Sequence, residues 1–152
     1  MNIKIFILIA MIFCHIVDDY YLQGWLASGK QKSWWNKNAP NQLYKNDYLM
    51  ALFCHSFSWS FMIQLPIFVY SFYYMKTFLW SIPLFIVNLI IHMYVDNLKA
   101  NQLKINLIQD QIIHFIQIII TWIILLYYII TKKKEFDNSF FFCYNIYRKY
   151  YS

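Results

Sequence analysis

The stretch Ile3–Gln23, IKIFILIAMIFCHIVDDYYLQ, decides the fold class of this chain. It is mainly an apolar run, and it approaches the ~20 residues that a helix needs to cross a bilayer. His15, Asp18 and Asp19 then follow within the same predicted helix. Ionisable side chains cost several kcal/mol in hydrocarbon, so they are rare there and usually functional. Because no small-x-small cleavage site follows, we expect a retained membrane helix rather than a signal peptide.

Three more apolar stretches have the length of membrane spans, at about Asp47–Tyr74, Phe78–Asp96 and Asn106–Thr131. The chain is 61% hydrophobic and 13% charged, whereas a soluble domain is nearer half apolar and a quarter charged. We therefore predict an all-α, integral membrane bundle of four transmembrane helices with an inward-facing His/Asp cluster near one leaflet. Residues 1–134 would form this membrane domain, and residues 135–152 an aromatic and basic C-terminal tail.

The net charge of +6 comes from lysines in the loops and in the tail. Such residues commonly flank membrane spans. Because they are divided among several loops, with no soluble basic module, nucleic acid is not an expected partner. Trp34, Trp35 and the lysines of the first loop, about Gly24–Asn46, suit a segment in the headgroup region. Membrane lipids are the expected partners, and the bacterial inner (plasma) membrane is the expected location.

The polar residues of the four spans share one depth. Consecutive spans run antiparallel, so the end of span one, the start of span two, the end of span three and the start of span four lie on one side of the membrane. All four histidines of the chain, and four of its seven acidic residues, occupy those places. They are His15, Asp18, Asp19, His55, His92, Asp96, Asp110 and His114. The sequence therefore predicts that these side chains meet in one site.

Their spacing predicts which side chains face each other. Residues four apart lie on one face of a helix, so His15, Asp19 and Gln23 form one stripe, and Asp18 is rotated by ~100° from it. A His and an Asp one turn apart can both bind a metal, or the Asp can orient the imidazole. The predicted metal ligands and their supports are His15, Asp19, His92, Asp96, Asp110 and His114.

Two further residues are predicted to act in the chemistry. His55 or Asp18 would serve as a ligand or as the general base, since a base must titrate near neutrality. The mixed imidazole and carboxylate set suits a divalent ion of Zn, Mn or Fe better than Cu(I) or Ca. A metal near the headgroup plane could activate water against an ester or phosphoester.

Three functions fit these residues. The first is a metal-dependent hydrolase acting on a lipid or lipid-linked substrate. The second is a proton- or metal-coupled transporter; it predicts polar residues through the whole bilayer, but the other halves of spans two to four carry only Gln64, Asn88 and Gln117. The third is a non-catalytic protein in which His–Asp pairs only hold helices together. So many ionisable groups at one depth favour a functional site.

The same residues resemble a known family. The run Phe13–Gln23 is similar to the His-x3-Asp-x3-Gln opening of the small phage and bacterial membrane proteins known as domain of unknown function 3307. The resemblance continues through His55, His92-x3-Asp96 and Asp110-Gln111-x2-His114, and it covers the chain to about Thr131. It implies a helical membrane protein, but no established reaction. Gln111, together with Gln23 and Lys99, is predicted to bind the substrate.

Overall fold

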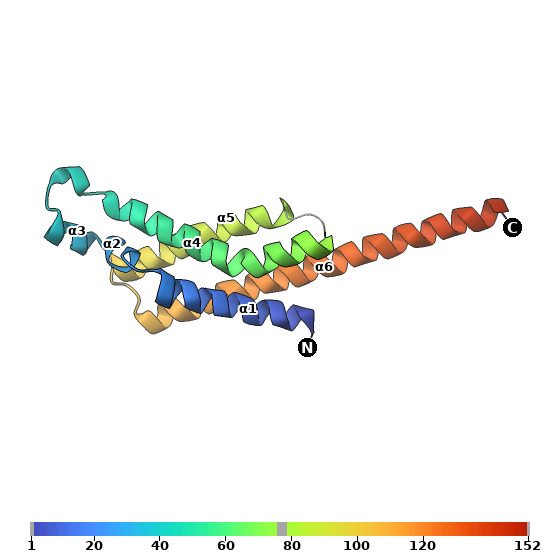
Figure 1. The fold of residues 1–152 in the computed structure, drawn as a ribbon, viewed down its shortest axis with the longest axis horizontal. Coiled ribbons are helices and arrows are strands. Elements are labelled where there is room, and N and C mark those ends of the chain that lie inside the picture. Colours follow the sequence, from blue (N-terminus) through green and yellow to red (C-terminus); the bar gives the residue numbers. More distant parts are fainter. Residues whose placement is uncertain (1, 76–78, 152) are drawn as a thin grey trace.

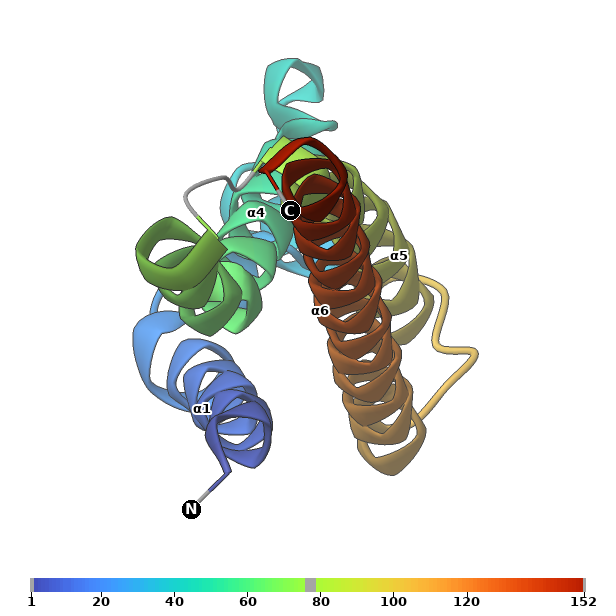
Figure 2. The same cartoon turned by 90° about the vertical axis from the view of Figure 1, so that its right-hand side faces the viewer.

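Four long helices dominate the computed structural model, which describes the backbone of residues 2–75 and 79–151 and the side chains of residues 2–74 and 79–132. All four are long and apolar enough to cross a membrane. They lie side by side in an elongated bundle (Figures 1 and 2). With no strand among the described residues, the prediction of an all-α bundle with four spans is confirmed. The spans are α1 (Ile3–Val17) with η1 (Asp18–Leu22), α4 (Asp47–Tyr70) with η3 (Ser71–Met75), and η4 (Leu79–Ser81) with α5 (Ile82–Ala100). The fourth is the part of α6 (Leu107–Tyr151) that runs to Lys132.

The distribution of side chains is the reverse of that in a soluble protein. Large apolar side chains face outward, and Phe13 and Ile108 are 64% and 70% exposed. Charged residues such as Asp96 and Asp110 are instead buried inside the bundle. Lipid solvates an apolar surface but not a carboxylate, so a membrane helix turns its ionisable residues toward its neighbours. This arrangement fits a bundle surrounded by hydrocarbon.

An apolar core fills the bundle beside the ionisable residues. Trp59 of α4 belongs both to this core and to the surroundings of the histidines. The core therefore fixes the positions of the helices from which the polar side chains project. Its buried members are Ile7, Met11, Trp59, Ile63, Ile67, Ile118 and Leu125.

The first loop is more ordered than the sequence indicated. It contains three short helical elements, α2 (Leu26–Gly29), α3 (Lys32–Asn38) and η2 (Gln42–Tyr44). We call residues 24–45 the cap segment, because α2 and α3 lie at one end of the bundle (Figure 1). Gly24 has a φ of +49°, a conformation that glycine adopts without steric cost, where the chain turns from η1 toward α2.

Two further boundaries matter for the site. α5 continues to Ala100, one turn beyond the predicted end at Asp96, so Lys99 is helical rather than part of a loop. α6 begins with a reciprocal cap in which Asn106 Oδ1 accepts from the Gln109 backbone N–H and Gln109 Oε1 accepts from that of Asn106. The side chains of the predicted tail, residues 135–152, lie outside the described residues.

Candidate metal centre

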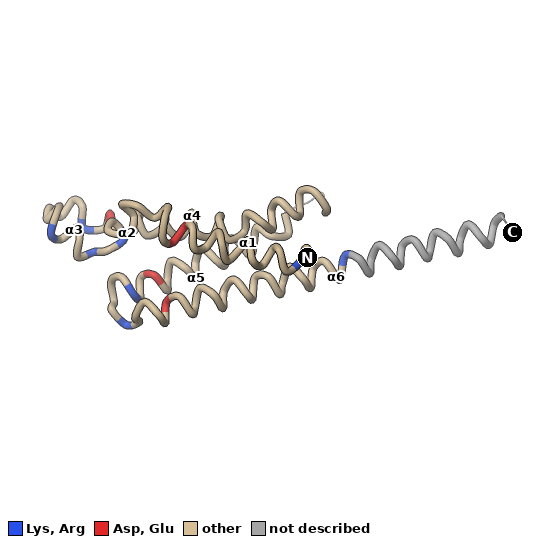
Figure 3. The backbone as a smooth tube through the Cα atoms, turned by 60° about the horizontal axis from the view of Figure 1, so that its bottom comes forward, with Lys and Arg blue, Asp and Glu red and all other residues tan. Residues whose placement is uncertain are grey.

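The ionisable residues of the four spans meet inside the bundle. The described acidic residues of the spans gather toward the end that carries α2 and α3 (Figure 3). All four histidines, together with Asp18, Asp96 and Asp110, are no more than 1% exposed. The prediction of an inward-facing His/Asp cluster is confirmed. We use "the cluster" for His15, Asp19, His55, His92, Asp96, Asp110 and His114.

His55, near the start of α4, is the centre of the cluster. Its Nε2 lies 3.2 Å from Asp96 Oδ2 and 3.4 Å from Asp19 Oδ1. The same nitrogen lies 3.2 Å from His92 Nε2 and 3.2 Å from Gln23 Nε2. Residues from η1, from the position after η1 and from α5 therefore converge on a single imidazole nitrogen of α4.

Two groups of three residues could each hold a metal ion. One is Asp19, His55 and His92, and the other is His92, Asp96 and His114. Within each group the ligand atoms lie within 4.8 Å of one another. A tetrahedral Zn, with bonds of about 2.1 Å, separates its ligand atoms by about 3.4 Å, so only small side-chain movements would close either group. His92 belongs to both groups.

His15 lies beside these groups rather than in them. Trp59 Nε1 donates a hydrogen bond to His15 Nδ1 at 2.7 Å, and His15 Nε2 donates to Gln111 Oε1 at 3.2 Å. Both ring nitrogens are therefore engaged, and the free lone pair needed for a metal is taken by the indole. In this arrangement His15 supports the cluster, with its Nδ1 3.9 Å from Asp19 Oδ2.

Gln111 joins three members of the cluster. Besides contacting His15, its Nε2 donates to Asp19 Oδ2 at 3.0 Å and to Asp110 Oδ2 at 3.2 Å. Gln111 and Gln23, predicted to bind substrate, both make hydrogen bonds to cluster residues in this structure.

Lys99 and Asp110 form an ion pair between the end of α5 and the start of α6. The additional turn of α5 brings the ammonium group to Asp110 Oδ2. The other oxygen, Asp110 Oδ1, lies 3.4 Å from His114 Nε2. Asp110 lies outside both metal-capable groups, and its position suits an orienting partner of His114.

Lys30 is a member of the site that sequence reasoning missed. Its Nζ donates to Asp96 Oδ2 at 2.5 Å, and the residue is 4% exposed. Asn101, at the end of α5, holds this part of the cap segment in place: its Nδ2 donates to the Lys30 carbonyl, and its Oδ1 accepts from the Lys32 N–H. In the sequence Lys30 resembles any loop lysine that flanks a span. No spacing pattern could have identified it.

Trp59 was also missed, although it lies one turn from His55 on α4. Its ring stacks on His92 with centroids 4.1 Å apart and planes at 16°. Together with its bond to His15, this contact holds two imidazoles on opposite sides of the cluster. The i+4 spacing from His55 was the available signal.

Asp18, predicted as a ligand or base, points toward a different part of α4. Its Oδ1 accepts a hydrogen bond from Ser58 Oγ at 2.5 Å. Asp19, the next residue, points instead toward His55 and Gln111. The π-helical turn η1, which contains both acids, therefore presents two carboxylates in different directions.

Several buried ligand-type atoms make no hydrogen bond. Apart from Asp18 Oδ2 of η1, they belong to residues of α5 and α6 on the His92–Asp96–His114 side of the cluster. Because a buried polar atom without a hydrogen bond costs ~1–3 kcal/mol, this part of the site has capacity for an additional bound group. The atoms of α5 and α6 are His92 Nδ1 and His114 Nδ1, together with His114 Nε2 and Asp110 Oδ1, which face each other at 3.4 Å without a hydrogen bond.

The chain was compared with family models, with curated proteins and with solved structures, and none of them matches. The family resemblance of the motifs therefore remains an expectation.

Proposed function

We propose that this protein is a membrane-embedded, metal-dependent hydrolase that cleaves an ester or phosphoester bond of a lipid or lipid-linked substrate. One observation carries the proposal: two metal-capable groups share His92 inside a membrane bundle. Interhelical packing alone needs only one or two polar contacts.

The donor atoms fit a divalent transition metal. Each group combines imidazole nitrogen with a carboxylate, a set that suits Zn, Mn or Fe. His114 Nε2 belongs to one of these groups, and it makes only long contacts of 3.4 Å to Asp110 Oδ1 and 3.6 Å to Asp96 Oδ1. Binding of an ion there would give this nitrogen a direct bond in place of the long contacts.

The remaining residues suit hydrolysis. When bound, the ion would act as a Lewis acid toward the substrate and toward water. When the ion occupies the His92–Asp96–His114 group, His55 is not a ligand, and its Nε2 lies between the carboxylates of Asp19 and Asp96, where it can accept a proton and hold it. Lys30 and Lys99 each neutralise one carboxylate, which limits the electrostatic repulsion within the buried cluster.

A transporter is the second candidate, and a specific observation favours it. The polar interior continues beyond the cluster, where Asn88 donates to Thr121 Oγ1 at 3.0 Å and Gln117 donates to Asn88 Oδ1 at 3.0 Å. Gln64 is also buried, and its amide nitrogen and oxygen have no hydrogen-bond partner. We rank this candidate second because Asn88, Gln117 and Thr121 bond mainly to one another, as interhelical contacts do.

Metal occupancy provides the first test. Purified protein, stripped of metal and offered Zn, Mn or Fe near neutral pH, should retain one of them by elemental analysis. His92→Ala removes a ligand from both groups and should abolish retention. Asn88→Ala, one turn away on α5, is the matched control and should retain the metal. If well-folded native protein binds none of these ions, the hydrolase proposal fails and the interhelical role is preferred.

Reaction assays then separate the two functional candidates. The hydrolase should release product from vesicles that contain a fluorogenic ester or phosphoester lipid, and only when the metal is present. A transporter should instead change the internal pH or metal content of proteoliposomes. Gln64→Leu should impair transport but leave hydrolysis intact.

A further inference from the structure

The cluster is closed to water from the end of the bundle. The cap segment lies there, with Lys30 bonded to Asp96 at 2.5 Å and Asn101 holding the backbone on both sides of Gln31. His55 is only 1% exposed beneath it. A substrate entering from water along the bundle axis would have to displace this segment.

A cavity on the side of the bundle offers another route. It has a volume of about 450 Å³ and lies between the end of the first span and α6. One of its lining residues, His15, belongs to the cluster, and another, Gln111, contacts the cluster directly. The lining residues are His15, Ile16, Tyr20, Tyr21, Gln111 and Phe115.

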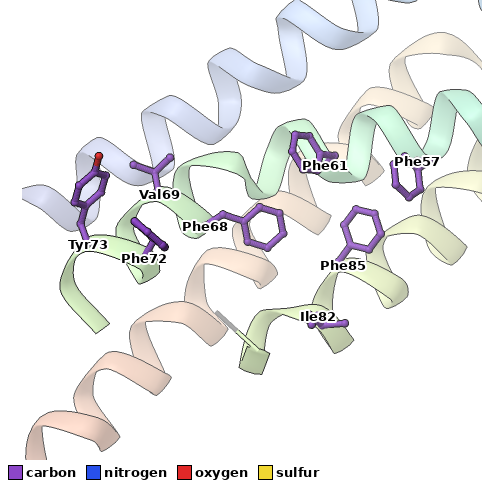
Figure 4. A pocket seen from close by; sticks show the side chains of 8 residues that line it. All are labelled: Phe57, Phe61, Phe68, Val69, Phe72, Tyr73, Ile82 and Phe85. Carbon is purple, nitrogen blue, oxygen red and sulfur yellow. The ribbon is translucent and has the colours of Figure 1, made fainter. Parts of the chain in front are cut away.

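The larger groove in Figure 4 has different surroundings. Its volume is about 570 Å³, and its lining is almost entirely apolar. Phe57, Phe61 and Phe85 are among the lining residues, and none of the lining residues belongs to the cluster. This groove therefore gives no access to the site.

Gln111 separates the lateral cavity from the acids. It is half-buried, and its amide donates to Asp19 and Asp110. Phe115 lies one turn further along α6, with its ring 5.3 Å from that of His15. A rotation of the Gln111 side chain would connect the cavity with the carboxylates.

The chemistry of the walls indicates the kind of molecule that would enter. Ile16 and Phe115 provide apolar contacts, while His15 and Gln111 provide polar groups at the inner end. Tyr20 and Tyr21 are exposed at 59% and 79%, and tyrosine favours the membrane–water boundary. The walls therefore match a molecule with an apolar chain and a polar group.

We propose that this cavity is a lateral entrance through which a membrane-resident amphiphile reaches the cluster, and that Gln111 is the residue that first contacts its polar group. The inference rests on the proposed function and specifies it further: the substrate comes from the bilayer, rather than from water. Gln111 would then exchange its bonds to Asp19 and Asp110 for a bond to the substrate.

Photocrosslinking in vesicles tests the entrance without knowledge of the natural substrate. The probe is a phosphatidylcholine analogue with a diazirine close to its headgroup, in phosphatidylcholine vesicles. In the native protein we expect adducts on His15 and Gln111, as well as on exposed residues such as Tyr127. Ile16→Trp should fill the cavity and remove the adducts on His15 and Gln111, while the Tyr127 adduct persists.

Two further variants complete the experiment. Ile120→Trp adds the same side chain at an exposed position of α6 outside the cavity, and it should leave all adducts unchanged. Ile16→Ala enlarges the cavity and should increase the adducts on His15 and Gln111. Labelling of Tyr127 without labelling of His15 and Gln111 in the native protein would overturn the entrance. Equal labelling in Ile16→Trp would also overturn it.

Zn occupancy of the same samples keeps the two proposals distinguishable. Adducts at His15 and Gln111 in protein that binds none of Zn, Mn and Fe would leave the entrance in place and remove the hydrolase. Zn binding without these adducts would leave the hydrolase in place and remove the entrance.

Discussion

At the scale of single residues, Asp96 is contacted by side chains from three different elements. Its Oδ2 is bonded to Lys30 of the cap segment and lies 3.2 Å from His55 of α4. Its Oδ1 lies 3.6 Å from His114 of α6. A carboxylate buried among apolar helices is tolerable only when its charge is compensated in this way.

Removal of Lys30 should destabilise the bundle. Lys30→Met leaves Asp96 buried without its closest cation, and breaking a buried pair from one side typically costs ~3–5 kcal/mol. Unfolding of the metal-free protein in detergent, followed by helicity, measures this loss. Lys37→Met makes the same change at an exposed position of the cap segment and should have little effect. Equal stability of the two variants would show that the Lys30–Asp96 pair contributes nothing.

The two adjacent acids of η1 should differ in their effect on metal binding. Asp19 belongs to a metal-capable group, so Asp19→Asn should weaken Zn affinity by at least about 10-fold, a loss typical even of supporting residues. Asp18→Asn retains a polar partner for Ser58 and should leave Zn affinity nearly unchanged. Calorimetric titration of both variants measures the difference. Equal losses would contradict the assignment of Asp19 to the metal group.

The cap segment is the element whose packing positions Lys30. Trp25, Trp34 and Trp35 pack edge to face, with ring centroids 5.1–5.9 Å apart. Trp35 Nε1 donates to the Gly29 carbonyl at 2.7 Å. Gly29 lies under the Trp25 ring, where an added Cβ would be 2.8 Å from the nearest ring atom. The residue before Lys30 therefore has to be small.

Gly29→Ala should disturb this element and, through it, the site. The steric conflict with the Trp25 ring should cost ~1–3 kcal/mol, as is usual for overpacking. Because Lys30 is adjacent, its contact with Asp96 should also weaken. Trp fluorescence and thermal unfolding measure the two effects. Ser28→Ala, a small change at the neighbouring position, is the control, and a Gly29→Ala protein with the stability of this control would contradict the packing argument.

The metal should stabilise the molecule as a whole, because the candidate ligands come from η1, α4, α5 and α6 and so from all four spans. A ligand that binds only the folded state adds ~2.7 kcal/mol at 100 times its Kd. Zn should therefore raise the Tm of the metal-free protein. Binding requires neutral imidazole, so this increase should become smaller as the pH falls through the range in which histidine becomes protonated. The Tm with and without Zn, measured across this pH range, tests the expectation; His92→Ala should show no increase at any pH.

The sequence alone was enough to predict the four spans and the depth of the polar residues inside the bundle. Hydropathy and length determined the four spans, because a bilayer imposes a minimum length on each helix independently of its neighbours. Antiparallel order then placed His15, His55, His92 and His114 at one depth. One-turn spacing placed Asp96 and Asp110 on the faces of their histidines. These are local constraints, and each can be evaluated along a single helix.

Tertiary structure alone decided which atoms meet inside the cluster. The pairing of Lys30 with Asp96 joins residues 66 positions apart, and it depends on how the cap segment folds on its own tryptophans. The engagement of both His15 nitrogens depends on the rotations of α4 and α6, from which Trp59 and Gln111 project. Hydrophobic periodicity determines which face of a helix is buried. It does not determine the axial offset or the rotamer that brings two buried polar atoms within bonding distance, because these follow from the packing of all four helices together.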